Sequence, residues 1–433
     1  MVDTSKIHLH DAAKVAKYSY PAFQKLAVIG LGYIGLPTAA VFADAGLEVV
    51  GVDVNPAAVD SINAGQPHIV EPNLDRLLQD VVEKKNLRAS LKAEAADAFI
   101  VAVPTPFKDD HVPDLKFIEA AARDIAASLR PGNLVILEST IPVGATEKMA
   151  AWLAEERPDL TFPQDVGETS DIRIAHCPER VLPGRILIEV IENDRVVGGM
   201  TRRCAERAAD LYKTVIRGNC HITEARTAEM AKLTENAFRD VNIAFANELS
   251  LICDRMEIDV WDLIKMANLH PRVNILQPGP GVGGHCIAVD PWFIVDSAPD
   301  LANVIRTARE VNDGKPEWVI SKVLEAAKEC GKNPTIACLG LAFKPNVDDL
   351  RESPALAITQ KLGGMGAGNI IAVEPHIDAL PQKLETAGIT LAPLDEALAE
   401  ADVVVLLVDH AQFLKVERTA LDGKVIIDTR GAW

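Results

Sequence analysis

A glycine-rich turn between a short apolar run and a helical segment constrains this chain more than any other feature. Residues 26–29 (Leu-Ala-Val-Ile) have the pattern of a buried strand. The turn that follows consists of Gly30, Leu31, Gly32, Tyr33, Ile34 and Gly35. Asp53 ends a second apolar run about 20 residues further along the chain. A strand, this turn, a helix and a second strand ending in a carboxylate predict a doubly wound, parallel α/β domain.

Each residue of this pattern has a physical role in holding a dinucleotide. Gly30 permits the tight turn, Gly32 lets the backbone approach a pyrophosphate, and Gly35 lets the helix pack closely on the sheet. A carboxylate at Asp53 suits the ribose hydroxyls of NAD and would repel the 2′-phosphate of NADP. The pattern therefore predicts NAD as the cofactor, and the alternative is a tight turn in an α/β fold without one.

Hydroxyl side chains follow the ends of two further predicted strands. Thr105 lies in Val103-Pro-Thr-Pro106, and Thr140 and Thr146 lie in and just after Ser139–Gly144. Ligands of open α/β sheets bind beyond the carboxyl ends of the strands, so these hydroxyls are candidates for contacts with cofactor or substrate. Capping and turn formation are the alternative use of threonine at such positions.

Composition excludes several classes of protein. The chain has 433 residues, which suits two or three domains, and its formal net charge of −18 disfavours nucleic acid or an anionic membrane as partner. None of the seven cysteines pair at CxxC spacing, so we expect no metal site or disulfide framework and a reducing, cytoplasmic setting. No apolar run approaches the roughly 18 residues that a membrane-spanning helix needs.

The pattern along the chain predicts three parts after an N-terminal extension at residues 1–24. We expect a Rossmann domain at 25–200, a central helical region at 201–315, and a further α/β domain at 316–433. Residues 227–256 have the composition of one long helix. Thr335–Leu339 with Gly340, and Ile370–Val373 with Glu374, repeat the pattern of the first domain, so a second nucleotide-binding domain is predicted.

Cys286 differs from the other cysteines because adjacent glycines, Gly283 and Gly284, leave its surroundings open to a substrate. Lys232 and Asn236 are four residues apart in the predicted long helix and share one face, with Arg239 one turn on. A cation near a cysteine lowers the pKa of the thiol. NAD, a reactive cysteine and a lysine suggest oxidation through a thiohemiacetal and a thioester, although a solvated helix face is the simpler interpretation of the spacing alone.

These residues give the chain a family resemblance over residues 25–433. It resembles the nucleotide-sugar 6-dehydrogenases, the UDP-glucose/GDP-mannose dehydrogenase family. The matching motifs are Gly30–Pro37, Val103–Pro106, Ser139–Gly144, Pro178–Gly184, Lys232–Asn236, Gly283–Cys286 and Phe343–Pro354. The stretch His270–Phe293 is most similar to the branch that acts on UDP-N-acetyl-D-mannosamine. The resemblance implies two Rossmann-like domains, an NAD-binding one at 25–200 and a UDP-binding one at 316–433, joined by a central long-helix dimerisation and catalytic region at 201–315. It also implies NAD-dependent oxidation of C6 to a uronate.

The resemblance also implies roles for individual residues. Cys286 would be the nucleophile, Lys232 and Asn236 would serve proton transfer and the oxyanion, and Asp290 and Thr140 would position water or a base. Residues expected to contact the substrate are Glu179, Arg180, Val181, Arg239, His270, Arg272, Gly283, Phe343, Lys344 and Arg430. Arg351 would approach the cofactor phosphates. Arg272 would reach the site of a neighbouring subunit, so a homodimer is expected.

Two departures from the glucose branch argue against UDP-glucose as substrate. A glutamate of that branch is replaced here by Pro183, and a lysine by Ala288. UDP-N-acetylglucosamine and UDP-N-acetylgalactosamine remain alternative substrates. A simple two-electron NAD dehydrogenase and a non-catalytic nucleotide-sugar binding protein are alternatives of other classes, which Cys286 and the second nucleotide domain disfavour.

Overall fold

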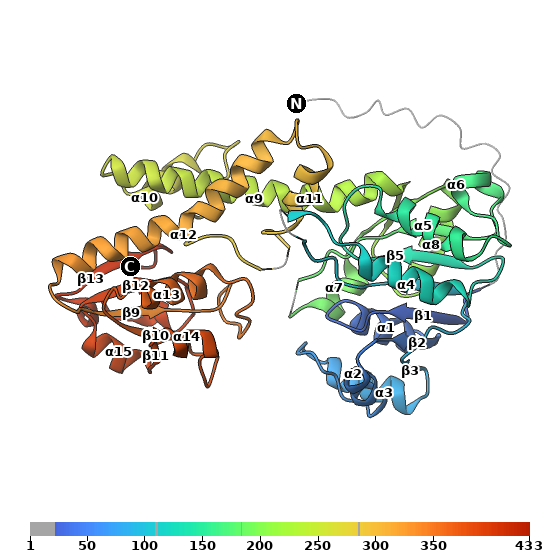
Figure 1. Cartoon of the computed structure of the whole chain (residues 1–433), viewed down its shortest axis with the longest axis horizontal. Coiled ribbons are helices and arrows are strands. Elements are labelled where there is room, and N and C mark those ends of the chain that lie inside the picture. The colour runs from blue at the N-terminus through green and yellow to red at the C-terminus, as the bar shows by residue number, and fades with distance from the viewer. Residues whose placement is uncertain (1–21, 109–110, 183, 285) are drawn as a thin grey trace. The chain divides into compact units, whose positions relative to one another are not determined.

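The structure is a computed structural model that describes residues 22–108, 111–182, 184–284 and 286–433 (Figure 1). Almost all of the predicted N-terminal extension lies outside these residues, as does Pro183. The chain forms two compact units. The N-terminal unit comprises the described chain up to Pro104 with Lys116–Ser139 and Thr146–Ala228, and the C-terminal unit comprises Thr105–Leu115, Thr140–Ala145 and Glu229–Trp433.

An eight-stranded sheet forms the core of the N-terminal unit. In sheet order its strands are β3 (Leu87–Ser90), β2 (Glu48–Val52), β1 (Lys25–Ile29), β4 (Ala98–Val101), β5 (Leu134–Leu137), β6 (Arg173–His176), β7 (Arg195–Gly199) and β8 (Cys220–Glu224). Neighbouring strands are parallel except β6 and β7, which are antiparallel. The order 3-2-1-4-5-6 is that of a dinucleotide-binding fold, so the predicted doubly wound first domain is confirmed.

Helices connect the strands of this unit. They are α1 (Gly35–Asp44), α2 (Pro56–Asn63), α3 (Leu74–Glu83), α4 (Lys116–Ala126), α5 (Ala145–Glu156), α6 (Pro163–Val166), α7 (Ile186–Glu192) and α8 (Arg202–Tyr212). Helix α1 packs on β2, and α8 packs on β6 and β7. Every residue of β4 and β5 is buried, as expected for central parallel strands covered on both faces.

The C-terminal unit contains a second parallel sheet. Its strands, in sheet order, are β11 (Thr390–Leu391), β10 (Asn369–Val373), β9 (Thr335–Leu339), β12 (Val403–Leu406) and β13 (Val425–Asp428). Its helices are α13 (Pro354–Gly364), α14 (Gln382–Thr386) and α15 (Leu394–Glu400), with short 3-10 turns η3 (Phe413–Lys415) and η4 (Arg418–Leu421). The first strand of this domain lies between the second and the fourth, as in the first sheet, so the predicted second Rossmann-like domain is confirmed.

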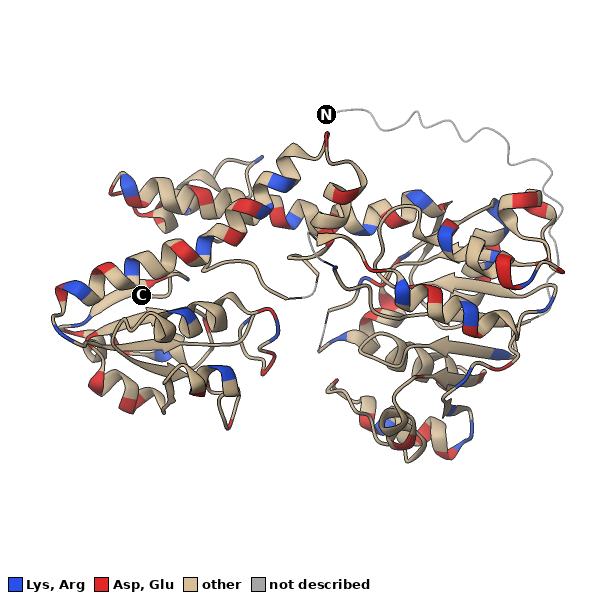
Figure 2. Cartoon of the chain, viewed as in Figure 1, with Lys and Arg blue, Asp and Glu red and all other residues tan. Residues whose placement is uncertain are grey.

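Two long and two short helices precede this second sheet. The long ones are α9 (Ala225–Arg255) and α12 (Asn303–Glu329), and the short ones are α10 (Val260–Ala267) and α11 (Asp290–Ser297). Helix α9 has 31 residues and agrees closely with the predicted long helix. Acidic and basic residues are interspersed along α12, as Figure 2 shows, rather than gathered by sign.

A buried polar chain joins α9 to α12 and to the loop before Cys286. Arg309 forms an ion pair with Asp240 at 2.6 Å, and Asn312 donates to the same carboxylate at 2.8 Å. Asn247 donates to the Oδ1 of Asn312 at 2.8 Å and accepts from the backbone N–H of Gly279 at 2.9 Å. These side chains are all buried, so their hydrogen bonds fix how the glycine-rich loop leaves the helices.

Candidate active site

The dinucleotide turn of the N-terminal unit adopts the geometry that its glycines predict. Gly30 has φ +90°, and its N–H donates to the carbonyl of Val52 at 2.8 Å. A Cβ at Gly30 would lie 2.6 Å from the carbonyl oxygen of Ala102, and one at Gly35 would lie 1.8 Å from that of Gly30. A Cβ at Gly32 would meet nothing within 4 Å. Two of the glycines are therefore required by the fold, whereas the third leaves open space beside the turn.

Asp53 holds this turn through its own carboxylate. Its Oδ2 accepts from the N–H of Leu31 at 2.9 Å, and its Oδ1 accepts from the N–H of Asn55 at 2.9 Å. Helix α1 begins at Gly35, and its first-turn N–H groups supply partial positive charge for a phosphate. An open turn, a helix N-terminus and a half-buried carboxylate are the groups that an NAD pyrophosphate and ribose require.

Other residues predicted to contact the cofactor have different surroundings. Tyr33 is exposed beside the turn, and Thr146 is fully buried near the start of α5. The Thr105 hydroxyl is buried and has no hydrogen-bond partner among the described residues, as a group reserved for a ligand would. Arg351 forms a two-pronged ion pair with Asp349, with distances of 2.8 and 2.6 Å.

In the C-terminal unit, α9 and α11 bring three predicted catalytic residues together. Lys232 and Asn236 lie one helical turn apart on α9, and the Nδ2 of Asn236 donates to the Oδ2 of Asp290 at 2.5 Å. Leu233 of α9 packs in the same apolar cluster as Phe293 of α11. This apolar contact sets the two helices at the separation that the polar pair needs.

Cys286 belongs to the same group because it precedes α11 directly. Its carbonyl accepts from the N–H of Asp290 at 2.9 Å, so the thiol and the carboxylate lie one turn apart. Cys286 is exposed, and Cys330 is the other exposed cysteine among the described residues. The positive charge of Lys232 lowers the pKa of both Cys286 and Asp290.

The electrostatics of the group differ from the sequence expectation for the thiol. Surrounding protein atoms desolvate Cys286 and raise its pKa, the negative charge of Asp290 raises it further, and Lys232 lowers it less. Burial raises the pKa of Asp290 to about 6, although the hydrogen bond from Asn236 and the charge of Lys232 oppose this shift. The free site therefore holds a protonated thiol beside an ionisable carboxylate.

Thr140, the fifth predicted catalytic residue, lies in a segment that is attached to the same helix. The N–H of Gly144 donates to the Oε2 of Glu229 on α9 at 2.7 Å, and Val143 packs against the cluster that contains Leu233. Glu229 is buried and lies one turn before Lys232. The segment is thus held close to the catalytic face of α9.

The loop before Cys286 also contacts residues predicted to bind the nucleotide. A Cβ at Gly283 would lie 2.4 Å from the carbonyl oxygen of Glu352, and one at Gly284 would lie 3.1 Å from the Phe343 ring. A Cβ at Gly279 would lie 2.7 Å from Arg430. Gly283 therefore has no room for a side chain, because the opposing atom belongs to the backbone, whereas a side chain at Gly279 or Gly284 would require Arg430 or Phe343 to shift. Lys344, which follows Phe343, is half-buried.

The remaining predicted substrate contacts have other local surroundings. His270, Arg272 and Arg239 are exposed, with Arg239 on α9. Glu179, in the N-terminal unit, accepts from Arg195 at 2.8 Å and from the N–H of Arg180 at 2.6 Å. Val181 is half-buried beside them.

Sequence reasoning missed a buried carboxylate that shares Arg195 with Glu179. Glu138 directly follows β5 and contacts Arg195, Tyr212 and Thr38 from a fully buried position. Burial, followed by the nearby charge of Glu179, raises the pKa of Glu138 to about 7. The available signal was a charged residue directly after the apolar run Leu134–Leu137, where an unpaired carboxylate is costly.

Two further observations bear on the site. A surface depression of about 630 Å³ in the N-terminal unit is lined by Glu147, Thr201, Arg202, Glu224 and Arg226, among others, and includes none of the predicted site residues. Within the part of the chain that the structure describes, no helix combines the length and apolar character needed to cross a bilayer.

Fold and turn geometry together define a dinucleotide-dependent dehydrogenase with a second nucleotide-binding domain. Comparison with known families identifies the class. The UDP-glucose/GDP-mannose dehydrogenase family matches in three parts: its NAD binding domain at residues 24–216, its central domain at 226–314 and its UDP binding domain at 337–433. The chain belongs to this family, and it is an NAD-dependent UDP-sugar dehydrogenase.

Individual relatives match over nearly the whole chain. An NDP-N-acetyl-D-galactosaminuronic acid dehydrogenase from Ralstonia nicotianae is 61% identical, over 95% of this chain and 96% of its own. The UDP-N-acetyl-D-mannosamine dehydrogenase of Escherichia coli is 60% identical, over 95% of this chain and 100% of its own. The UDP-D-ManNAc dehydrogenase structure from Pyrococcus horikoshii superposes with a TM-score of 0.84 at 37% identity, covering 95% of this chain and 96% of its own.

Adding a methyl group should have different consequences at Gly35, which is closely packed, and at Gly32, which faces open space. Gly35→Ala places a Cβ 1.8 Å from the Gly30 carbonyl oxygen, so both the thermal unfolding midpoint and NAD affinity should fall. Gly32→Ala meets no protein atom within 4 Å, so it should fold normally and lose NAD affinity alone. Calorimetric unfolding and NAD titration of both variants measure the difference. Unchanged NAD affinity in Gly32→Ala would show that this turn is not part of the cofactor site.

The buried carboxylate of Asp290 predicts a pH-dependent cost in stability. Its folded-state pKa of about 6 lies above the unfolded value of about 3.9, so the native state holds the proton more tightly. Stability should therefore fall as the pH rises from 4 to 6, by on the order of 2–3 kcal/mol. Asp290→Asn should unfold at a higher temperature than the wild type at pH 7, and the difference should vanish near pH 4.

Asp300→Asn removes the same charge at an exposed position of the same unit and provides the control. An Asp290→Asn midpoint that never exceeds that of the wild type would show that the ionised carboxylate is not destabilising in this site.

Proposed function

We propose that the protein oxidises C6 of UDP-N-acetyl-D-mannosamine to give UDP-N-acetyl-D-mannosaminuronate, through covalent intermediates on Cys286. The observation that carries the proposal is the group of Cys286, Lys232, Asn236 and Asp290 in a chain that is 60% identical to the Escherichia coli relative. The Ralstonia relative favours a second candidate substrate, UDP-N-acetyl-D-galactosamine, since its identity is as high.

The chemistry balances as two oxidations and one hydrolysis. Bound NAD would supply the hydride acceptor for each oxidation. The primary alcohol first loses a hydride and a proton and becomes an aldehyde. The Cys286 thiol then adds across that aldehyde, and the thiohemiacetal loses a second hydride and proton to become a thioester. Water cleaves the C–S bond and yields the carboxylate, the free thiol and one proton. Two NADH form per sugar, and the reactive aldehyde stays attached to the protein.

Lys232 and Asn236 act on the oxygen of each tetrahedral species. The ammonium group of Lys232 supplies positive charge near Cys286, and Asn236 keeps one N–H available beside the one that it donates to Asp290. Donors placed where negative charge develops typically contribute about 10²–10³ in rate each. Lys232 also exchanges the proton of the C6 hydroxyl, for which a lysine is suited once it is desolvated.

Asp290 and Thr140 act on the hydrolytic water. With a pKa of about 6, Asp290 is mostly ionised at neutral pH and can take a proton from water one turn from the sulfur. Thr140 contributes a hydroxyl from the segment that Glu229 holds against α9. The carboxylate performs the proton transfer, and the hydroxyl orients the water.

The remaining predicted residues are assigned to the substrate and the cofactor. Phe343, Lys344 and Arg430 hold the UDP moiety, which the proximity of Arg430 to Gly279 and of Phe343 to Gly284 supports. Residues nearer the sugar are Glu179, Arg180, Val181, Arg239, His270 and Gly283. Tyr33, Ile34, Thr105, Thr146 and Arg351 contact the cofactor together with the glycine turn and Asp53.

A homodimer completes this proposal. Phe238, Phe245 and Ile252 are exposed on α9 at intervals of seven residues, so they lie along one side of the helix. Three large apolar side chains in a row on a long helix are typical of a surface that another protein covers. The second copy of this chain brings its exposed Arg272 to the substrate of its neighbour.

The first experiment counts NADH per sugar with four nucleotides: UDP-N-acetylmannosamine, UDP-N-acetylgalactosamine, UDP-N-acetylglucosamine and UDP-glucose. We expect two NADH per sugar with the mannosamine nucleotide and slow turnover with the others. Two NADH per sugar with only the galactosamine nucleotide would support the same chemistry and identify that nucleotide as the substrate.

Cys286→Ser should lose at least ~10³ in the rate of uronate formation and release no more than one NADH per sugar. Cys330→Ser, at the other exposed cysteine, is the matched control and should leave both readings unchanged.

A mixture of two inactive variants tests whether Arg272 acts across the dimer. Cys286→Ser and Arg272→Ala should each be inactive alone. Subunits exchanged at random give half heterodimers, each with one intact site, so activity should return to about a quarter of the wild-type value. Activity assays after unfolding and refolding the mixture provide the measurement. A mixture that stays inactive, although sedimentation shows heterodimers, would place Arg272 in its own subunit's site.

A further inference from the structure

The second sheet repeats the glycine turn of the first at an equivalent place. Gly340 has φ +96°, and its N–H donates to the carbonyl of Val373 at 2.8 Å, as Gly30 does to Val52. The next N–H, from Leu341, donates to the Oε2 of Glu374 at 2.7 Å. Glu374 therefore has the structural position of Asp53, at the end of the second strand of its sheet.

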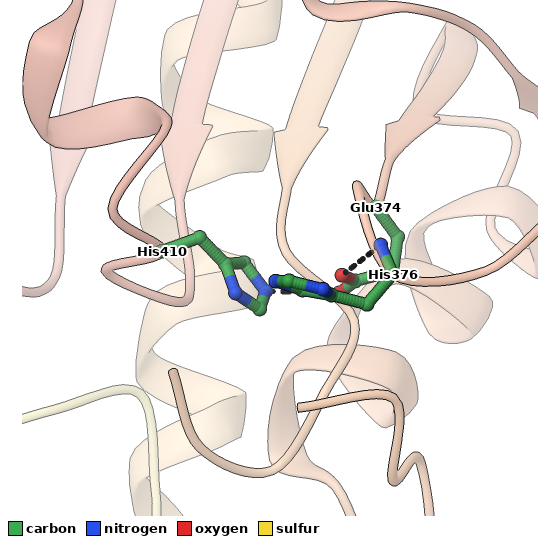
Figure 3. A group of neighbouring side chains, drawn as sticks. All are labelled: Glu374, His376 and His410. Carbon is green, nitrogen blue, oxygen red and sulfur yellow. Dashed lines mark hydrogen bonds and ion pairs between the residues drawn. The ribbon is translucent and has the colours of Figure 1, made fainter. Parts of the chain in front are cut away.

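Glu374 differs from Asp53 because a buried histidine also bonds to it. The Oε2 of Glu374 lies 3.1 Å from the Nε2 of His410 (Figure 3). The same oxygen accepts from the N–H of Ala342 at 3.0 Å. The side chains of Glu374 and His410 are both fully buried. Burial alone would raise the pKa of Glu374, but the hydrogen bonds from His410, Leu341 and Ala342 outweigh it and lower the pKa. The carboxylate is thus an ionised anchor inside the domain.

His410 bonds to the far end of the same loop through its other ring nitrogen. The backbone N–H of Asn346 donates to Nδ1 at 2.9 Å, so Nδ1 carries no proton and Nε2–H is the donor to Glu374. The N–H of Ala411 donates to the Oδ1 of Asn346 at 2.9 Å. Asn346 has φ +60°, a left-handed conformation that costs free energy unless its surroundings hold it.

Glu374, His410 and the neighbouring His376 resemble a metal site. Glu374, His376 and His410 have potential ligand atoms within 4.8 Å of one another, and no ion is needed to explain this. Both ring nitrogens of His410 are already used in hydrogen bonds, so coordination would require breaking one of them. The exposed His376 contacts the cluster through its backbone N–H, which donates to Glu374, and through its ring, 4.9 Å from that of His410.

The loop between these two attachment points carries the residues that we assign to UDP. Phe343 and Lys344 lie between Ala342, held by Glu374, and Asn346, held by His410. The Phe343 ring also lies against Gly284, two residues before Cys286. A shift of this loop would therefore move both the nucleotide contacts and a neighbour of the nucleophile.

We propose that His410 is a positioning residue for UDP recognition, because it joins the two ends of the Leu341–Asn346 loop and fixes Phe343 and Lys344 between them. This inference rests on the proposed function, in which this loop holds the UDP moiety. His410 does not touch the nucleotide itself. It acts through the main chain of Asn346 and through Glu374.

The test is calorimetric titration of the full-length protein with UDP, together with steady-state kinetics. His410→Ala should weaken UDP binding roughly tenfold to a hundredfold and raise the KM for the UDP-sugar by a similar factor. The kcat should fall by a smaller factor, and NAD affinity should stay nearly unchanged. His410→Asn, which restores an acceptor near Nδ1, should recover part of the loss. Asn346→Gly keeps the left-handed conformation and the main-chain bond but loses the link to Ala411, so it should show a smaller loss in a folded protein. His376→Ala, at the exposed neighbour, is the matched control and should bind UDP as the wild type does.

The outcomes separate the possible errors. Wild type that binds no UDP would overturn the proposed function of the domain itself. Wild-type affinity in His410→Ala and Asn346→Gly would overturn the positioning role alone. A stoichiometric metal ion whose removal abolishes UDP binding, with a loss in His376→Ala as large as in His410→Ala, would replace the positioning role with a metal site.

Discussion

One interaction recurs in both sheets and sets the geometry of both nucleotide sites: a carboxylate at the end of the second strand accepts from the N–H that follows the turn glycine. Asp53 does this for Leu31, and Glu374 does it for Leu341. The turn glycine has a positive φ in each case, so any other residue there would be strained. The turn therefore has no side chain at this position that could pack against the rest of the protein. The carboxylate replaces that packing with a charge-assisted hydrogen bond.

The same hydrogen bond between carboxylate and turn has different roles in the two domains. Asp53 is half-buried, so its carboxylate can still meet the hydroxyls of a ribose. Glu374 is buried and bonded to His410, which directs its charge into the protein. A duplicated turn has thus produced one carboxylate that can meet a ligand and one that supports a loop. This difference in burial is associated with the segment after β12, where the second domain places His410 against the carboxylate.

The sequence predicted the elements well because their signals are local. The turn at Gly30, the long helix α9 and the strands β1, β2, β9 and β10 each follow from residues close together in the chain. The hydrogen-bonded pair of Asn236 and Asp290 spans 54 residues, and that of His410 and Glu374 spans 36. Such pairs depend on how helices and strands pack, which local patterns do not encode. The reversal of direction between β6 and β7 was missed for a related reason, since a short buried strand has the same apolar pattern whichever way it runs.

The active-site group has a property that neither residue type nor spacing could predict: its two acids influence each other. Ionised Asp290 raises the pKa of Cys286, so a proton on either group favours ionisation of the other. In the proposed hydrolysis, Asp290 takes a proton from water in the step that leads to release of the sulfur. Its charge is neutralised as the sulfur leaves with its electron pair, which makes the departing thiolate more stable. Lys232 adds to this effect from α9, because its positive charge lowers the pKa of both groups. Burying Asp290 therefore costs stability in the resting protein and favours the departure of the sulfur in the last step of the reaction.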